Sequence, residues 1–178
     1  MKSEYQHSQA QRKHLQPLDP ERLRALAVGY VGRYATSCAR LTAFLERKVN
    51  ERGWRGDGGA PIVRIVAEFA SLGYVDDQAF ATARSESLLR RGYGPNRLRH
   101  SLKESGIETE IIERTANIDD DAALAAALAF ARRKRIGPHA RTPFGPDIRR
   151  KMMAALLRAG HNYNVSRTVL DMPAIDPE

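Results

Sequence analysis

The sequence predicts an all-α protein of three tandem three-helix repeats that form an elongated curved array. Apolar residues recur with helical spacing, sustained period-2 alternation typical of strands is missing, and similar landmarks return roughly every 50 residues. Repeats of this kind contact mainly their neighbours, which favours an elongated array over a ball. The chain has 178 residues, 42% of them hydrophobic, and this suffices for a core without a metal or disulfide.

Helical stripes run along the whole chain. Three stripes follow the spacing i, i+3, i+4, i+7: Leu23/Leu26/Ala27/Tyr30, Ile62/Ile65/Val66/Phe69 and Leu124/Ala127/Leu128/Ala131. Shorter amphipathic segments lie at residues 41–49, 98–102, 111–116, 148–156 and 165–169. Helices this short are marginal alone in water, so we expect each stripe to be buried against a neighbouring helix.

Glycines and aromatic residues reveal the repeat. Gly53, Gly106 and Gly160 each follow a polar helical end, where glycine readily takes the positive φ that ends a helix. The aromatic residues recur at equal intervals, at Tyr30, Phe80 and Phe130. We therefore predict a disordered N-terminal leader over residues 1–18 and repeats over residues 20–73, 74–117 and 118–172.

The sequence offers little for catalysis. It has no G-x-x-x-x-G-K-[ST] phosphate loop, and its five histidines lack zinc-site spacing, so we expect them on the surface. Asp76 and Asp119 stand where helices begin, and capping is a better interpretation than magnesium binding. Cys38 has no histidine near it in sequence and is expected to be a small buried side chain. We predict no catalytic residues, no metal and no cofactor.

The composition indicates a polyanionic partner. Lys and Arg number 29 against 21 acidic residues, for a net charge of +8. The longest apolar run, residues 122–131, is too short to cross a membrane. The single cysteine fits a reducing compartment. We expect a cytoplasmic monomer that does not bind membranes.

The positive charge is concentrated in two clusters, separated by an acidic stretch at residues 108–121. A solvated surface is the simplest interpretation of such a cluster, but two of them in consecutive repeats suggest one shared cationic face. We predict that this face contacts the partner or DNA. Its candidate contact residues are Arg84, Arg90, Arg91, Tyr93, Arg97, Arg99, Lys103, Arg132, Arg133, Lys134, Arg135, Arg149, Arg150 and Lys151.

One string of residues resembles a known family. The string comprises Gly73-Tyr74-Val75-Asp76-Asp77, Phe80-Ala81, Arg91-Gly92-Tyr93-Gly94-Pro95 and Gly106-Ile107, with Arg97, Leu98 and Leu102. Together these residues are similar to the central signature of the RecX regulatory proteins. Residues 148–160 resemble the last long helix of that family, and residues 40–48 match in pattern. Two features depart from the family pattern. His161 stands where the family usually has an aromatic residue, and residues 54–61 look like an insertion.

The resemblance implies an all-helical array of three-helix repeats and a partner. RecX proteins bind the RecA recombinase filament on DNA, lie in its helical groove, and restrain ATP hydrolysis, strand exchange and repressor self-cleavage. For this chain it implies modulation, and we expect inhibition, of those activities in DNA repair and the SOS response. The family has no catalytic residues to carry over.

Two alternatives stay open at this stage. The chain could be a sequence-tolerant protein whose short helices act on naked DNA like helix-turn-helix modules, or an adaptor whose basic face meets acidic side chains. Direct contact with single- or double-stranded DNA is also open. Within the signature we expect Tyr74 and Phe80 to be core aromatics and Gly106 to be a cap, whereas Tyr93 either wedges its turn or stacks on a partner.

Overall fold

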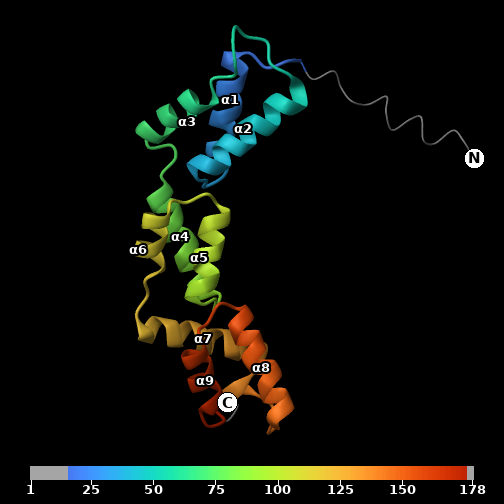
Figure 1. Cartoon of the computed structure of the whole chain (residues 1–178), viewed down its shortest axis with the longest axis vertical. Coiled ribbons are helices and arrows are strands. Elements are labelled where there is room, and N and C mark those ends of the chain that lie inside the picture. Colours follow the sequence, from blue (N-terminus) through green and yellow to red (C-terminus); the bar gives the residue numbers. More distant parts are fainter. Residues whose placement is uncertain (1–15, 176–178) are drawn as a thin grey trace, which may run out of the picture. The chain divides into compact units, whose positions relative to one another are not determined.

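The computed structural model describes residues 16–175 of the chain. That part contains nine α-helices, one short 3-10 helix and no β-strand, so the all-α prediction is confirmed (Figure 1). The helices are α1 (Pro20–Val31), α2 (Cys38–Arg52), α3 (Ile62–Ser71), α4 (Asp77–Arg90), α5 (Pro95–Glu104), α6 (Thr109–Ala116), α7 (Asp120–Lys134), η1 (Gly137–His139), α8 (Pro146–Arg158) and α9 (Tyr163–Asp171).

The chain divides after Asp76 into two compact units. The first unit contains α1–α3 and the second contains α4–α9. Three α-helices lie in each of the spans predicted as repeats, and the third span also contains η1. The repeat boundaries themselves stay a prediction. Residues 1–15 of the predicted leader lie outside the described residues. Leu18, its last residue, is fully buried, and we therefore assign it to the first unit.

The first unit packs three amphipathic helices around one apolar cluster. Leu23 of α1, Leu41 of α2 and Phe69 of α3 are all fully buried in it. The segment before α1 is tied to the end of α2, because the Leu18 amide donates to the Gly53 carbonyl at 2.9 Å. Leu18 also forms an isolated parallel bridge with Trp54. These backbone contacts join the segment before α1 to the segment after α2.

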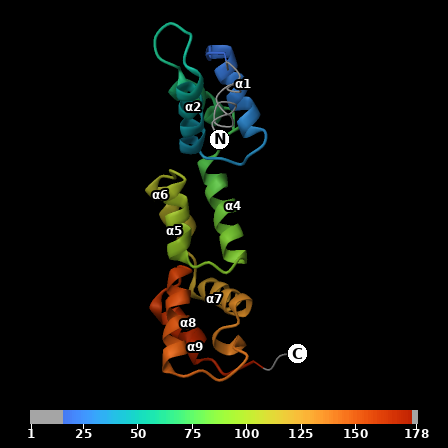
Figure 2. The ribbon, with the colours of Figure 1, turned by 90° about the vertical axis from the view of Figure 1, so that its right-hand side faces the viewer.

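The second unit contains two further groups of three helices. In both ribbon views α5 and α6 lie beside α4, and Phe80, Leu102 and Ile112 fill the space between them (Figures 1 and 2). In α7–α9 the buried residues include Phe130, Leu156 and Val169. Most of the short apolar stripes are therefore buried against neighbouring helices, as expected, but Ile148, at the start of the stripe over residues 148–156, is 49% exposed.

Several local predictions are confirmed. Gly53, Gly106 and Gly160 have φ values of 81°, 69° and 94°, and each follows the end of a helix. Asp119 caps α7, since its Oδ1 accepts a hydrogen bond from the Ala122 amide at 2.7 Å. Tyr74 is the exception. It was expected in the core, but it is 61% exposed at the turn between α3 and α4, with its ring 5.6 Å from the Phe69 ring, centroid to centroid.

Within residues 16–175, none of the helices combines the length and the hydropathy needed to cross a bilayer.

Candidate functional site

The candidate site is built where the turn between α4 and α5 meets the turn between α8 and α9. The two turns touch through their backbones: the Gly94 amide donates to the Ala159 carbonyl at 2.9 Å, and the Asn96 amide donates to the Gly160 carbonyl at 3.1 Å. A Cβ atom on Gly94 would overlap the Gly160 backbone, and one on Gly160 would overlap the Arg97 backbone. Only glycine permits this approach, which joins the two three-helix groups of the second unit.

A buried histidine completes this contact. His161 follows Gly160, is only 2% exposed, and its Nε2 donates to the Gly92 carbonyl at 3.1 Å. Its ring lies 6.0 Å from the Phe130 ring, centroid to centroid. Burial lowers the pKa of His161 below its ordinary value of 6.5, because the charged imidazolium would lose its hydration. The prediction of a surface histidine is therefore wrong here, since the α4–α5 turn covers it.

Tyr93 lies in the same turn, where its half-buried side chain packs against two apolar clusters of the second unit and two guanidinium groups lie near its ring. Arg91 and Arg133 place their guanidinium carbons 5.4 and 5.5 Å from the Tyr93 ring centroid. Arg133 also lies 5.4 Å from the Phe130 ring centroid and donates to the Arg91 carbonyl. Such cation–π contacts hold positive charge in place over an aromatic face. Residues 42 apart in sequence are thus brought into one cationic–aromatic cluster.

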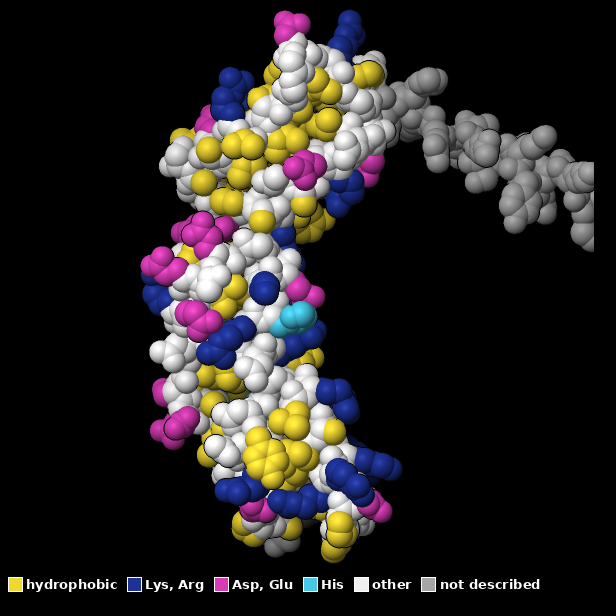
Figure 3. Space-filling view, viewed as in Figure 1, with side chains coloured by type: hydrophobic (Ala, Val, Ile, Leu, Met, Phe, Trp, Pro, Cys, Tyr) yellow, Lys and Arg dark blue, Asp and Glu magenta, His cyan; other side chains and the backbone are white. Residues whose placement is uncertain are grey.

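A groove of about 440 Å³ opens beside this cluster. We call it the basic groove and define it by its lining residues, which are Tyr93, Phe130, Lys134, Ile136, Ala155, Arg158 and Ala159. These lining residues include two cations and no acid, and Arg91 and Arg133 add their charge over Tyr93. Figure 3 shows Lys and Arg side chains bordering hydrophobic ones on the face formed by the C-terminal helices. The groove therefore presents apolar surface within a positive rim.

Some predicted contact residues are engaged within the chain. On α4 and α5, Arg84 Nε donates to Ser101 Oγ at 3.0 Å. Arg90 pairs with Glu86 at 3.6 Å, and Arg99 pairs with Glu113 at 3.7 Å. Arg84 is thus hydrogen-bonded and Arg90 and Arg99 are ion-paired within the second unit.

The same holds for α8. Arg149 Nη1 donates to the Leu170 carbonyl at 2.8 Å, and its Nη2 lies 2.5 Å from Asp171 Oδ1. Arg150 pairs with Asp147 on the surface of α8. Arg149 therefore joins α8 to α9, a structural role that the charge pattern did not distinguish from partner contact.

The remaining predicted cations are exposed and have no carboxylate within ion-pairing distance among residues 16–175. They are Arg97, Lys103, Arg132, Lys134, Arg135 and Lys151. Of these, the structure places only Lys134 in the basic groove. Arg135 also ends α7, with a φ of 55° in the left-handed region. The sequence interpretation missed Arg158, which lines the groove from α8 next to the Ala159-Gly160 turn.

Metal binding has no support in the described chain. Among residues 16–175 no group of three His, Cys, Asp or Glu side chains lies close enough together to hold an ion.

Comparisons with known proteins agree with this architecture. Residues 76–115, which contain α4, α5 and all but the last residue of α6, match the family model described as RecX, second three-helix domain. The chain is 29% identical to regulatory protein RecX of Myxococcus xanthus over 170 residues, covering 89% of each protein. It is 33% identical over 109 residues to a regulatory protein RecX of Thermus thermophilus, covering 61% of this chain and 71% of that relative.

Solved structures show the same fold. A crystal structure of RecX from Lactobacillus salivarius matches with a TM-score of 0.68 at 17% identity, covering 85% of this chain and 96% of that chain. A second structure of a regulatory protein RecX matches with a TM-score of 0.64 at 15% identity, covering 88% and 80%. Helices and groove together define an all-helical protein of three-helix modules with a cationic–aromatic surface. By sequence, the chain belongs to the RecX family of regulatory proteins.

Proposed function

We propose that this protein binds the RecA recombinase filament on DNA and inhibits its ATPase, strand-exchange and coprotease activities, without catalysing a reaction itself. Membership of the RecX family supports the RecA filament as the partner. The basic groove is the observation that carries the proposal, because it combines aromatic surface, four nearby cations and no lining acid in the described chain. Such a surface suits acidic protein side chains or DNA phosphates.

Inhibition then follows from differential affinity. A ligand changes the balance between two filament states only by binding one of them more tightly. Tyr93 supplies aromatic contact area at the groove, which Phe130 lines from the core at only 6% exposure, while Lys134, Arg158 and Arg133 supply charge. We propose that these groups meet complementary groups in one filament state and not in the state that hydrolyses ATP rapidly.

The function is tested by measuring RecA ATPase activity on single-stranded DNA with increasing amounts of this protein. We expect the rate to fall at substoichiometric amounts, because one bound molecule affects neighbouring protomers of a polymer. An unchanged or increased rate at equimolar protein would contradict the proposal.

Binding to naked DNA is the second candidate function. The exposed cations Arg97, Lys103 and Lys151 favour it, since phosphate contacts need only accessible positive charge. In that case affinity for bare duplex falls steeply with salt, and adding recombinase has no further effect on binding. If the protein prefers recombinase-coated DNA over bare DNA at physiological salt, the filament is the target.

A further inference from the structure

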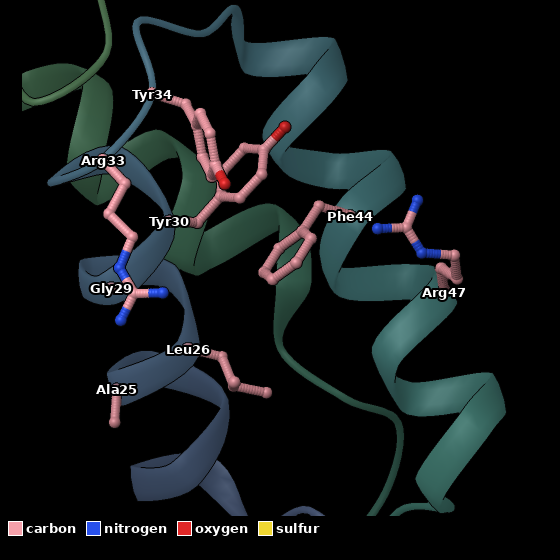
Figure 4. Close-up of a pocket in the computed structure, with 8 residues that line it drawn as sticks. All are labelled: Ala25, Leu26, Gly29, Tyr30, Arg33, Tyr34, Phe44 and Arg47. Carbon is pink, nitrogen blue, oxygen red and sulfur yellow. The ribbon is translucent and has the colours of Figure 1, made fainter.

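The first unit carries a second candidate site that the proposed function does not use. Helices α1 and α2 border a pocket of about 560 Å³, which we call the α1–α2 pocket (Figure 4). It lies outside residues 76–115, the span that matches the family model. The residues that line it are Ala25, Leu26, Gly29, Tyr30, Arg33, Tyr34, Phe44 and Arg47.

One wall of the pocket is aromatic. Tyr30 and Phe44 stack with ring centroids 4.1 Å apart and planes inclined by 13°. Tyr34 extends this wall, with its centroid 5.4 Å from that of Tyr30, and its side chain is 58% exposed. Stacking between α1 and α2 holds the inner two rings in place, so the wall offers preorganised apolar surface to a ligand.

The floor of the pocket is aliphatic and contains a helical glycine. Ala25, Leu26 and Gly29 come from successive turns of α1. A Cβ atom on Gly29 would meet nothing within 4 Å, and its φ is not in the left-handed region, so neither space nor backbone geometry requires glycine. Glycine within a helix lowers helix stability relative to alanine. Here it leaves open the volume that a side chain would fill.

Positive charge borders the pocket, and its lining residues include no acid. Figure 4 shows the Arg33 side chain extended along α1 from the end that carries Tyr34, whereas Arg47 projects from α2 beside Phe44. The Arg47 guanidinium lies 5.6 Å and the Lys48 ammonium 6.0 Å from the Phe44 ring centroid. Arg47 has one exposed partner, Glu51 at 3.6 Å, and Arg33 has no ion pair among residues 16–175. Both guanidinium groups are therefore accessible to an anionic ligand.

This arrangement favours a peptide over a nucleobase. The edges of a base carry hydrogen-bonding groups that would lose water against the floor of Ala25, Leu26 and Gly29 without gaining partners there. An aromatic or large aliphatic side chain has no such groups and matches both the floor and the stacked wall. Carboxylates on either side of that side chain would match Arg33 and Arg47.

We propose that the α1–α2 pocket binds an acidic peptide segment of a partner protein. One large apolar side chain of the segment enters the pocket, and flanking carboxylates pair with Arg33 and Arg47. The pocket lies in the first unit and the basic groove in the second. Peptide binding by the pocket can therefore be tested separately from filament binding by the basic groove.

The probe is the synthetic peptide acetyl-DDFDD-amide, titrated into the full-length protein and followed by NMR. We expect saturable shifts of the Gly29 and Tyr34 amides and of the Leu26 methyl groups. The peptide acetyl-DDADD-amide tests the apolar anchor and acetyl-KKFKK-amide tests the charge, and both are expected to shift these signals at least about tenfold less at equal concentration. Equal shifts with all three peptides, or no saturable shifts with DDFDD, would overturn the proposal.

Two variants locate the binding. Gly29→Leu fills the pocket with a residue of higher helix propensity, so loss of binding cannot be attributed to loss of the fold. The double variant Arg33→Glu/Arg47→Glu removes the charge match and should weaken binding at least about tenfold. Its matched control is Arg55→Glu/Arg64→Glu, which makes the same charge change at exposed sites of the first unit outside the pocket.

A titration with nucleic acid distinguishes between the two classes of ligand. Oligothymidylate of twelve nucleotides is titrated under the same conditions. If it saturates the Gly29 and Tyr34 shifts more tightly than DDFDD and loses this binding in Gly29→Leu, the pocket is a base-stacking site and the peptide proposal is wrong. If it leaves these signals unchanged while DDFDD shifts them, the peptide assignment is supported.

Discussion

Gly94 and Gly160 lack side chains at the place where two turns of the second unit touch through their backbones. We expect Gly94→Ala to lower the free energy of unfolding by about 2–4 kcal/mol, because the added methyl group meets backbone that cannot move aside cheaply. Urea denaturation measures the change.

The matched control is Gly145→Ala. A Cβ atom there meets nothing within 4 Å, and the expected cost is below about 1 kcal/mol, mainly from the helix cap of α8. Equal effects of the two substitutions would contradict the close packing of the turns.

His161 makes the stability of the second unit sensitive to pH. Burial holds its folded-state pKa below 6.5, so below about pH 6.5 the unfolded chain binds more protons than the folded chain. The stabilisation is complete above that pH and declines as the pH falls toward the folded-state pKa. Urea unfolding of the native protein at pH 7.5 and pH 5.5 should show this loss.

The variant His161→Phe isolates the effect, because phenylalanine occupies the same buried site and does not titrate. Its difference in stability between the two pH values should be smaller than that of the native chain, since other groups titrate alike in both proteins. An identical pH dependence in both would show that His161 does not contribute.

Some features of single residues are predictable from the sequence, and others depend on contacts between distant segments. The positive φ values of Gly53, Gly106 and Gly160 were predictable from their places after polar helical ends. Whether His161 or Tyr74 is buried depends on which distant segment covers it. His161 is covered by a turn 69 residues away, and periodicity along the chain contains no information about that contact.

At the scale of helices, Arg149 of α8 contributes to the packing of α9. Its hydrogen bond to the Leu170 carbonyl and its contact with Asp171 join the two helices. We expect Arg149→Ala to accelerate amide hydrogen exchange in α9 and to cost about 1 kcal/mol, since the pair is partly exposed and screened by solvent.

Arg150→Ala is the control for this prediction. Arg150 pairs with Asp147 within α8, and both side chains are about four-fifths exposed, at 79% and 83%. Exposed pairs of this type contribute little, so exchange in α9 should be unchanged. If Arg150→Ala accelerates exchange as much as Arg149→Ala does, the assigned role of Arg149 is wrong.

Helices were the most predictable level of this molecule. The apolar stripes that begin at Leu23, Ile62 and Leu124 lie on α1, α3 and α7, because helical spacing directly reports a buried face. The division of the arginines was not predictable. Charge runs show where cations are numerous, but an arginine that turns inward, such as Arg84 toward Ser101, looks the same in sequence as one that faces solvent.

The molecule as a whole has two compact units with different surfaces. The first carries the α1–α2 pocket and the second carries the basic groove. A partner that engaged both proposed sites at once would bind more tightly than through either alone, because the second contact would form within the complex. The net charge of +8 adds a salt-dependent attraction to any polyanionic assembly.

We propose that the basic groove contacts the recombinase filament. This contact is tested most directly by inhibition of RecA ATPase on single-stranded DNA, comparing Arg133→Glu/Lys134→Glu with the matched control Arg141→Glu/Arg167→Glu. Both double variants make the same change in net charge at exposed residues of the second unit, but only the first alters the groove. We expect that half-inhibition needs at least about tenfold more of the groove variant than of the native chain, whereas the control stays within about twofold. Equal inhibition by the groove variant and the native protein would contradict the proposed contact.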